Sequence, residues 1–219
     1  CGEICETGAL DGGVFDTGEV FSLLDTLTNR LSIKSIGIGV PGVPDGLEYL
    51  RKNEINQMER FSIGRMIHER YGIPIVLEND LSAIAYGFAR CYLNQYPNEA
   101  CKDIHMAYLH FEKGCLSAGF ISNGRLISGW NHYSGELGMF PMGEDITLDN
   151  VLDAPKPDMD YAQTVAKVIA GICCILNPQY VALGGSSFRK SCLPLIDECY
   201  QHTLPPELAA ELLYADDVW

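Results

Sequence analysis

The chain has 219 residues, of which 47% are hydrophobic and 20% are charged, and its formal net charge is −14. This length suits one large domain or two small lobes, and the composition excludes an intrinsically disordered chain and a coiled coil. A surface this negative repels phosphodiester backbones, so we expect this segment itself to contact no nucleic acid.

The first half of the chain alternates helical and strand patterns. The patterns predict, in chain order, a helix, a strand, a helix, a strand and a helix at residues 19–31, 35–40, 61–71, 73–77 and 81–92. Pro41-Gly42 ends the first strand, and Glu78-Asn79-Asp80 ends the second.

The second half begins with a block of strands and returns to helices. Strands are expected at 104–110 and 116–122, and Asn123-Gly124 predicts a hairpin to a third strand at 125–128. The remaining segments are an exposed loop, a helix, a strand and two helices at residues 143–160, 161–176, 180–183, 191–200 and 206–214. Helices alternating with strands, together with a hairpin block, predict an α/β fold in which mixed sheets are flanked by helices.

Membrane, targeting and metal signals are weak. No run of about 18 apolar residues occurs, which predicts no membrane span. The start, Cys1–Glu6, lacks the basic and apolar regions of a signal peptide, so we expect a cytoplasmic protein. Nine scattered cysteines without a Cys-x-x-Cys pair predict reduced, mostly buried thiols and neither a disulfide framework nor a zinc ribbon.

Polar residues at strand ends are the candidate site, because ligands of open α/β sheets bind beyond the carboxyl ends of the strands. Asp80 follows an apolar strand, where its carboxylate can accept a proton from a bound hydroxyl, and Asn79 offers both a donor and an acceptor. The alternative is that either residue only caps the helix that begins at Leu81.

Two glycine-containing segments are further candidates. In Ser134–Gly138, glycines on both sides of Glu136 allow close approach to a ligand, but they are equally consistent with a simple turn. Gly184-Gly185 can accept a nucleotide or turn the chain, and Trp130 can stack on a sugar or fill a gap.

Taken in order, several motifs resemble the ROK family, which groups sugar kinases with sugar-responsive transcriptional repressors. The motifs are Ile36–Gly42, Tyr71–Asp80, Ser122–Gly124, Gly129–Asn131, Gly135–Gly138 and Asn177–Gly185. The resemblance runs from about Leu31 to Gly185. It implies an actin-like, ribonuclease-H-like ATPase-type fold of two lobes, with residues 1–80 as the rest of the N-terminal lobe and 81–219 as the C-terminal lobe.

The resemblance also implies roles for individual residues. Asp80 would be the catalytic base that deprotonates a sugar hydroxyl for attack on the γ-phosphate of ATP, with Mg²⁺ neutralising charge. Asn79 and Glu136 would hold sugar hydroxyls, and Gly42 would line the same pocket. The cofactor side would be formed by three glycines, namely Gly114, Gly184 and Gly185.

The departures from the family pattern lie on the phosphate side and in the metal loop. The first phosphate loop, Asp-x-Gly-Gly-Thr, is missing, and Asp11-Gly12-Gly13 is followed by Val14. The second phosphate loop contains Glu112, whose charge has the wrong sign to stabilise phosphate oxygens. Met139 stands where the family has a zinc-binding His, and no cysteine lies between Cys115 and Cys173, so zinc is not predicted.

Three hypotheses follow. The first is the sugar-binding, effector-sensing domain of a transcriptional regulator with a degenerate ATP site. The alternative is a sugar kinase that transfers the ATP γ-phosphate to a hexose or N-acetylhexosamine, and the third is a non-catalytic scaffold. ATP and Mg²⁺ are expected only for the kinase. The expected partners are a small-molecule sugar and, by family analogy, a second copy in a homodimer, with no membrane contact.

Overall fold

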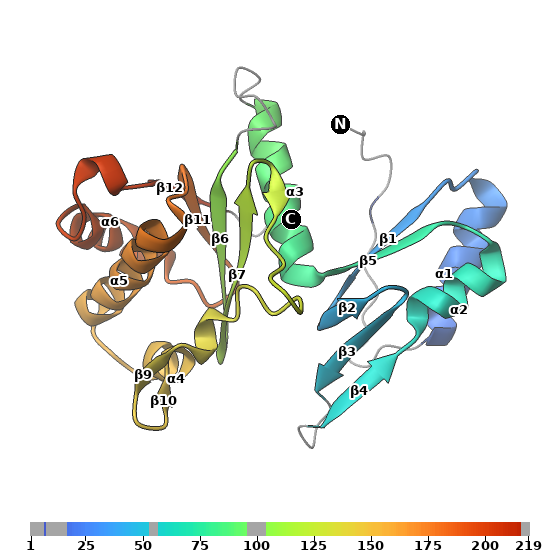
Figure 1. Ribbon diagram of the computed structural model, residues 1–219, viewed down its shortest axis with the longest axis horizontal. Coiled ribbons are helices and arrows are strands. Elements are labelled where there is room, and N and C mark those ends of the chain that lie inside the picture. The colour runs from blue at the N-terminus through green and yellow to red at the C-terminus, as the bar shows by residue number, and fades with distance from the viewer. Residues whose placement is uncertain (1–6, 8–16, 53–56, 96–103, 216–219) are drawn as a thin grey trace. The chain divides into compact units, whose positions relative to one another are not determined.

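A computed structural model describes residue 7 and residues 17–52, 57–95 and 104–215 (Figure 1). The chain divides into two compact units, Cys1–Asp80 and Leu81–Trp219, which are called unit 1 and unit 2 below.

Unit 1 combines a parallel strand pair with an antiparallel meander. The pair is β1 (Ile36–Val40) with β5 (Ile75–Asn79), and the meander runs in the order β2-β3-β4. The remaining elements are α1 (Thr17–Arg30), β2 (Val43–Asp45), β3 (Glu48–Lys52), β4 (Met58–Phe61) and α2 (Ile63–Tyr71). Five buried side chains form the core between strands and helices, namely Val40, Tyr49, Ile63, Ile67 and Leu77.

The meander was not expected from the sequence. Its strands have only three to five residues each, and most side chains of β4 are exposed, so no two-residue hydrophobic alternation signals them. Contacts between the strands hold it together. The Tyr49 and Phe61 rings stack at 5.1 Å, and Arg60 donates to Asp45 Oδ2 at 2.7 Å and to Glu48 Oε2 at 2.9 Å.

Unit 2 is built on a five-stranded mixed sheet with the order β12-β11-β6-β7-β8. The strands are β6 (Met106–Glu112), β7 (Cys115–Ser122), β8 (Arg125–Leu126), β11 (Tyr180–Gly184) and β12 (Glu211–Tyr214), and a separate small hairpin pairs β9 (Pro141–Gly143) with β10 (Ile146–Thr147). The helices are α3 (Asp80–Gln95), η1 (Leu137–Met139), α4 (Leu148–Asp153), α5 (Asp158–Leu176), η2 (Lys190–Cys192), α6 (Leu193–Gln201) and η3 (Pro206–Leu208).

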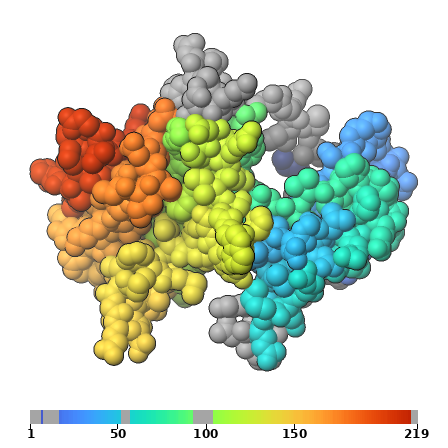
Figure 2. Space-filling model, in the orientation of Figure 1, coloured from blue at the N-terminus to red at the C-terminus, as the bar shows by residue number. Residues whose placement is uncertain are grey.

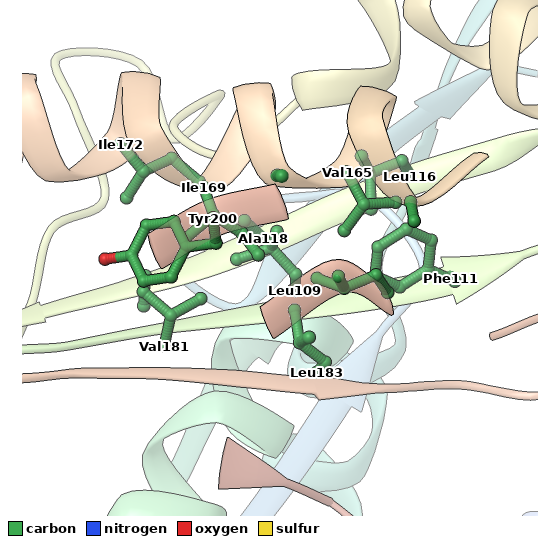
Figure 3. Packing of buried hydrophobic residues seen from close by; sticks show 14 of the residues in the cluster. Leu109, Phe111, Leu116, Ala118, Val165, Ile169, Ile172, Val181, Leu183 and Tyr200 are labelled. Carbon is green, nitrogen blue, oxygen red and sulfur yellow. The ribbon is translucent and has the colours of Figure 1, made fainter. Parts of the chain in front are cut away.

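Helices cover both faces of this sheet, as expected. Because side chains alternate along a strand, Leu109 and Val181 lie in one core, and their neighbours Tyr108 and Ala182 lie in the other. The first core packs under α5 and α6, and the second packs under α3 (Figure 1). Figure 3 shows Val165 and Ile169 of α5 directed at side chains of the sheet.

Two expectations for unit 2 were wrong. The segment 143–160 is not a loop, because it contains β10, α4 and the start of α5. Thr147 and Asn150 form a capping box for α4, and Leu148 is buried at 1% exposure, which fixes this short helix. Residues 206–214 are not one helix, since only Pro206–Leu208 is helical and Glu211–Tyr214 pairs in parallel with β11.

Helix α5 has the length and apolar composition of a membrane span, and within the described ranges it is the one helix that does. Its sequence contains no uninterrupted apolar run of about 18 residues, because Asp160 and Lys167 interrupt it. Its inward residues, among them Val165, Ile169 and Ile172, lie in the core of unit 2. This packing accounts for the apolar composition.

Candidate functional site

The structure brings together three of the predicted site residues in unit 1. Strands β1 and β5 are parallel neighbours, with Val40 opposite Asn79, so their carboxyl ends meet at one edge of the sheet. The Asn79 Nδ2 group donates a hydrogen bond to the Gly42 carbonyl at 3.1 Å. Asp80 follows directly, and a Cβ on Gly39 would lie 3.5 Å from its Cα. Gly39, Gly42, Asn79 and Asp80 therefore form one cluster, called the strand-end cluster below.

Packing requires glycine at position 42. A Cβ there would lie 2.3 Å from the Leu50 carbonyl oxygen, so any side chain would displace β3. The glycine thereby allows the chain leaving β1 to pass close to β3. This close packing places the Gly42 carbonyl within reach of the Asn79 amide.

Asp80 is half-buried and is the first residue of α3. The N-terminus of a helix stabilises a carboxylate, which agrees with the capping interpretation. A carboxylate at this position can also accept a proton or hydrogen bonds from hydroxyl groups. Capping and ligand binding are compatible at this residue.

Glu136 lies in unit 2, directly before η1, and its side chain is exposed. The flanking glycines serve packing. A Cβ on Gly135, which has φ +101°, would lie 1.8 Å from the Ala118 carbonyl oxygen, and one on Gly138 would lie 2.1 Å from an Asp149 carboxylate oxygen. These contacts fix the backbone on both sides of Glu136.

The three glycines predicted for the cofactor side also lie in unit 2. Gly114, with φ +72°, occupies the β6–β7 turn and donates its N–H to Asp153 Oδ1 at 3.0 Å. A Cβ on Gly185 would lie 2.4 Å from the Phe111 carbonyl oxygen, and one on Gly184 would lie 2.8 Å from the Tyr108 hydroxyl. Contacts between β6 and β11 therefore explain Gly184 and Gly185 without a ligand.

Glu112 lies next to this glycine pair and binds the residue that follows it. Its carboxylate accepts a short hydrogen bond from the Ser186 hydroxyl and one of 3.2 Å from the Ser186 N–H. The His110 Nε2 atom lies 3.0 Å from Glu112 Oε1. These contacts, led by the Ser186 hydroxyl, lower the pKa of Glu112. Sequence reasoning identified Glu112 but missed Ser186 and His110.

A cavity of about 160 Å³ lies beside Glu112, between the β6–β7 turn, α4 and the residues after β11. Arg189 stacks over the Tyr161 ring at 4.6 Å, and burial raises the pKa of Tyr161 to about 12. The Asp149 carboxylate accepts the Leu116 N–H at 2.7 Å, and burial raises its pKa. No sequence pattern signalled this cavity, because its walls come from four separate segments.

Several other expectations can be compared with the structure. Trp130 fills no gap, since 96% of its surface is exposed. Of the six cysteines in the described ranges, two are buried (Cys173 and Cys192), two are half-buried (Cys91 and Cys199) and two are exposed (Cys115 and Cys174). The expectation of mostly buried thiols therefore does not hold for these six. Among the described residues no group of three or more His, Cys, Asp or Glu side chains is placed to hold a metal ion. The segment Asp11-Gly12-Gly13 lies outside the described residues.

Comparison with solved structures gives similar folds at low sequence identity. The Lmo2764 protein from Listeria monocytogenes matches with a TM-score of 0.72 and 14% identity over 99% of this chain and 87% of that chain. A ROK family glucokinase from Streptomyces griseus, in complex with glucose and AMPPNP, matches with a TM-score of 0.62 and 13% identity. This match covers 90% of this chain and 81% of that chain. A ROK family transcriptional regulator, a homolog of the E. coli MLC protein, matches with a TM-score of 0.67 and 18% identity. This match covers 90% of this chain but only 62% of the regulator's own length.

These likenesses confirm the expected fold class, an actin-like α/β fold with mixed sheets flanked by helices. No curated protein matches the chain. The model of the ROK family matches residues 18–150, which is more than half of the chain. The chain therefore belongs to the ROK family.

Proposed function

We propose that this chain is a sugar-binding ROK domain that senses an effector sugar for a transcriptional regulator and has a degenerate ATP site. The observation that carries the proposal is a contrast between two places. The strand-end cluster retains the polar groups that a sugar needs, whereas Glu112 already occupies the hydrogen-bond donors beside Gly184-Gly185.

The strand-end cluster suits a sugar. Asn79 is held by the Gly42 carbonyl, which orients its amide, and the Asp80 carboxylate lies next to it in the chain. A carboxylate and an amide together offer acceptors and donors for neighbouring hydroxyl groups. Glu136 is proposed as a further ligand for sugar hydroxyls from unit 2, as the family resemblance implies.

The nucleotide side suits a phosphate poorly. Backbone N–H and hydroxyl donors are the groups that bind phosphate oxygens, and at Ser186 both donate to the Glu112 carboxylate instead. A side chain at position 184 or 185 would clash with Tyr108 or Phe111, so close packing accounts for both glycines without a ligand. The residues present therefore do not fit an ATP phosphate at this place.

The alternative is a ROK-type sugar kinase, and Asp80 is the observation that favours it. In that case Asp80 would accept the proton of a hexose or N-acetylhexosamine hydroxyl, and ATP with Mg²⁺ would supply the phosphoryl group. A regulator domain needs the same sugar contacts but no phosphoryl transfer. It would instead relay sugar occupancy to a DNA-binding segment.

Sugar binding is tested by thermal unfolding and calorimetry of the full chain with a panel of hexoses and N-acetylhexosamines. A ligand present at 100 times its dissociation constant stabilises the folded state by about 2.7 kcal/mol. We expect at least one sugar to raise the melting temperature of the wild type. Asp80→Asn should abolish this shift, and the matched control Asp197→Asn, at an exposed position on α6, should retain it. If no sugar at millimolar concentration shifts the melting temperature, both sugar hypotheses fail.

Release of ADP in the presence of ATP, Mg²⁺ and the stabilising sugar distinguishes the two functions. No turnover together with sugar-dependent stabilisation supports the sensor and excludes the kinase. ADP release that Asp80→Asn abolishes would establish the kinase and contradict the proposal.

A further inference from the structure

A surface groove of about 380 Å³ lies between α5 and α6 in unit 2. The two helices are neighbours, and in Figure 2 the red atoms of α6 border the light-orange atoms of α5. Three side chains with metal-binding atoms line this groove, namely Met159 from the first turn of α5, Cys199 from α6 and His202 directly after α6. They are called the sulfur–imidazole cluster below.

The two sulfur atoms of the cluster have the separation expected for two ligands of one ion. The Cys199 Sγ atom lies 3.8 Å from the Met159 Sδ atom. Sulfur ligands lie about 2.3 Å from a first-row metal ion, so two of them that share an ion at a tetrahedral angle lie about 3.8 Å apart. Met159 is 42% exposed and Cys199 is half-buried, so an ion can reach both sulfur atoms from solvent.

The hydrogen bonding of His202 leaves one ring nitrogen able to bind a metal. The Nδ1 atom of His202 lies 2.7 Å from the Glu198 carbonyl oxygen. Since a carbonyl oxygen only accepts, Nδ1 carries the hydrogen and Nε2 keeps its lone pair. A ring N–H held by a backbone carbonyl is the usual arrangement in a metal-binding histidine. The backbone of His202 is helical, so this residue lies on the same face as Cys199, three residues earlier.

The donor atoms select a soft, monovalent ion. Thiolate and thioether sulfur atoms favour copper(I), whereas zinc takes thiolates, imidazoles and carboxylates. A thiolate, a thioether and a neutral imidazole together carry one negative charge, so their complex with copper(I) is neutral. Lys167 lines the same groove and would repel the positively charged complex that a divalent ion forms with these ligands.

We infer that Met159, Cys199 and His202 bind one copper(I) ion, which joins the first turn of α5 to the end of α6. Binding forms a bond between copper and Cys199 Sγ, and the thiol proton passes to solvent. Among the described residues no three His, Cys, Asp or Glu side chains form a metal site, and here a methionine supplies the third ligand. The inference concerns unit 2 alone and is independent of whether the strand-end cluster binds a sugar.

The test is the protection of Cys199 from iodoacetamide in the full chain, measured for each cysteine peptide by mass spectrometry in an oxygen-free, reducing buffer. Copper(I) is supplied from its bicinchoninate complex, which sets the free concentration. We expect copper to slow the alkylation of Cys199 at free concentrations that leave the exposed Cys115 and Cys174 reactive, because Cys199 has two further ligands beside it. X-ray absorption should show two sulfur atoms and one nitrogen atom bound to copper.

Two variants test the other ligands while the cysteine stays in place. Met159→Leu keeps the size and apolar character of the side chain, and His202→Gln changes an exposed position, so both chains should fold. Each should raise the copper concentration that half-protects Cys199 by roughly 10-fold or more, since loss of even an outer partner of a metal ligand costs about 10- to 100-fold in affinity. The control Met142→Leu, at a 45% exposed position in β9, should leave the protection unchanged.

Thermal unfolding followed by circular dichroism checks the fold of each variant. Four results would each overturn the inference. They are an unprotected Cys199, protection of Cys115 and Cys174 at the same copper concentration, protection that survives both Met159→Leu and His202→Gln, and equal protection by zinc at the same free concentration.

Discussion

Replacing Glu112 by glutamine tests whether this carboxylate excludes phosphate from the loop after β11. The change keeps the size of the side chain and removes its charge. The wild-type carboxylate accepts from the Ser186 hydroxyl and from the Ser186 N–H at 3.2 Å, and His110 Nε2 lies 3.0 Å from it. Glutamine can retain some of these hydrogen bonds, so the local backbone should stay in place. Any change in anion affinity then reports the charge.

The size of the effect follows from Coulomb's law. A phosphate bound to the Ser186 donors would come within about 4 Å of Glu112, where two unit charges repel by about 1 kcal/mol in water and about 4 kcal/mol near a protein surface. The Glu112 side chain is 45% exposed, so the lower part of this range applies. We expect Glu112→Gln to raise the affinity for Mg-ATP or AMPPNP by about 5- to 30-fold.

The assay is calorimetric titration of wild type and Glu112→Gln with AMPPNP and Mg²⁺ at low salt. Glu198→Gln, at an exposed position on α6, removes the same overall charge elsewhere and serves as the control. Added salt should reduce the difference, because screening weakens repulsion between exposed charges. Equal nucleotide affinity in wild type and Glu112→Gln, or tight binding by the wild type, would refute the reasoning about Glu112.

The same variant makes a prediction about pH. The folded-state pKa of Glu112 is lowered, chiefly by the Ser186 hydroxyl, so the carboxylate adds stability above its unfolded pKa of about 4.3 and loses it as the pH falls through the folded value. Urea unfolding between neutral and acidic pH should show this loss in the wild type and less of it in Glu112→Gln. An identical pH dependence in the two proteins would contradict the assignment.

Two stability predictions follow from buried contacts in unit 2. Tyr200→Phe should lower the free energy of unfolding by about 1–3 kcal/mol, because the Tyr200 hydroxyl accepts a hydrogen bond from the buried Ala210 N–H at 2.6 Å. Phenylalanine would leave this N–H without that acceptor. In urea unfolding, Tyr133→Phe at an exposed position should change the free energy of unfolding little. An equal loss of stability in Tyr200→Phe and Tyr133→Phe would disprove the explanation. Gly185→Ala should destabilise by about 1–3 kcal/mol or more, given φ +104° and the Phe111 carbonyl oxygen 2.4 Å from a Cβ. Gly87→Ala, in α3 with no atom near its Cβ, should stabilise by about 1 kcal/mol, and the same sign for both glycines would refute this account.

Long elements with a regular hydrophobic period were predictable from the sequence. The helical spacing placed α5, and the apolar runs placed β6 and β11, since every residue of β11 is buried between helices on both faces. Short strands were not predictable. Glu211–Tyr214 has only four residues, and its pairing with β11 decides that it is a strand. Hydrogen bonds to a neighbour distant in sequence outweigh a weak local preference.

In the candidate site, too, local features were predictable from the sequence and contacts between distant residues were not. The sequence by itself determined that Asn79 and Asp80 end an apolar strand, because the change from apolar to polar residues is local. Only the tertiary structure decided that Asn79 binds the Gly42 carbonyl, 37 residues earlier, and that Glu112 binds Ser186, 74 residues later. The physical reason is that a strand's period records which side chains are buried, whereas the pairing of strands and the packing of loops decide which distant groups meet.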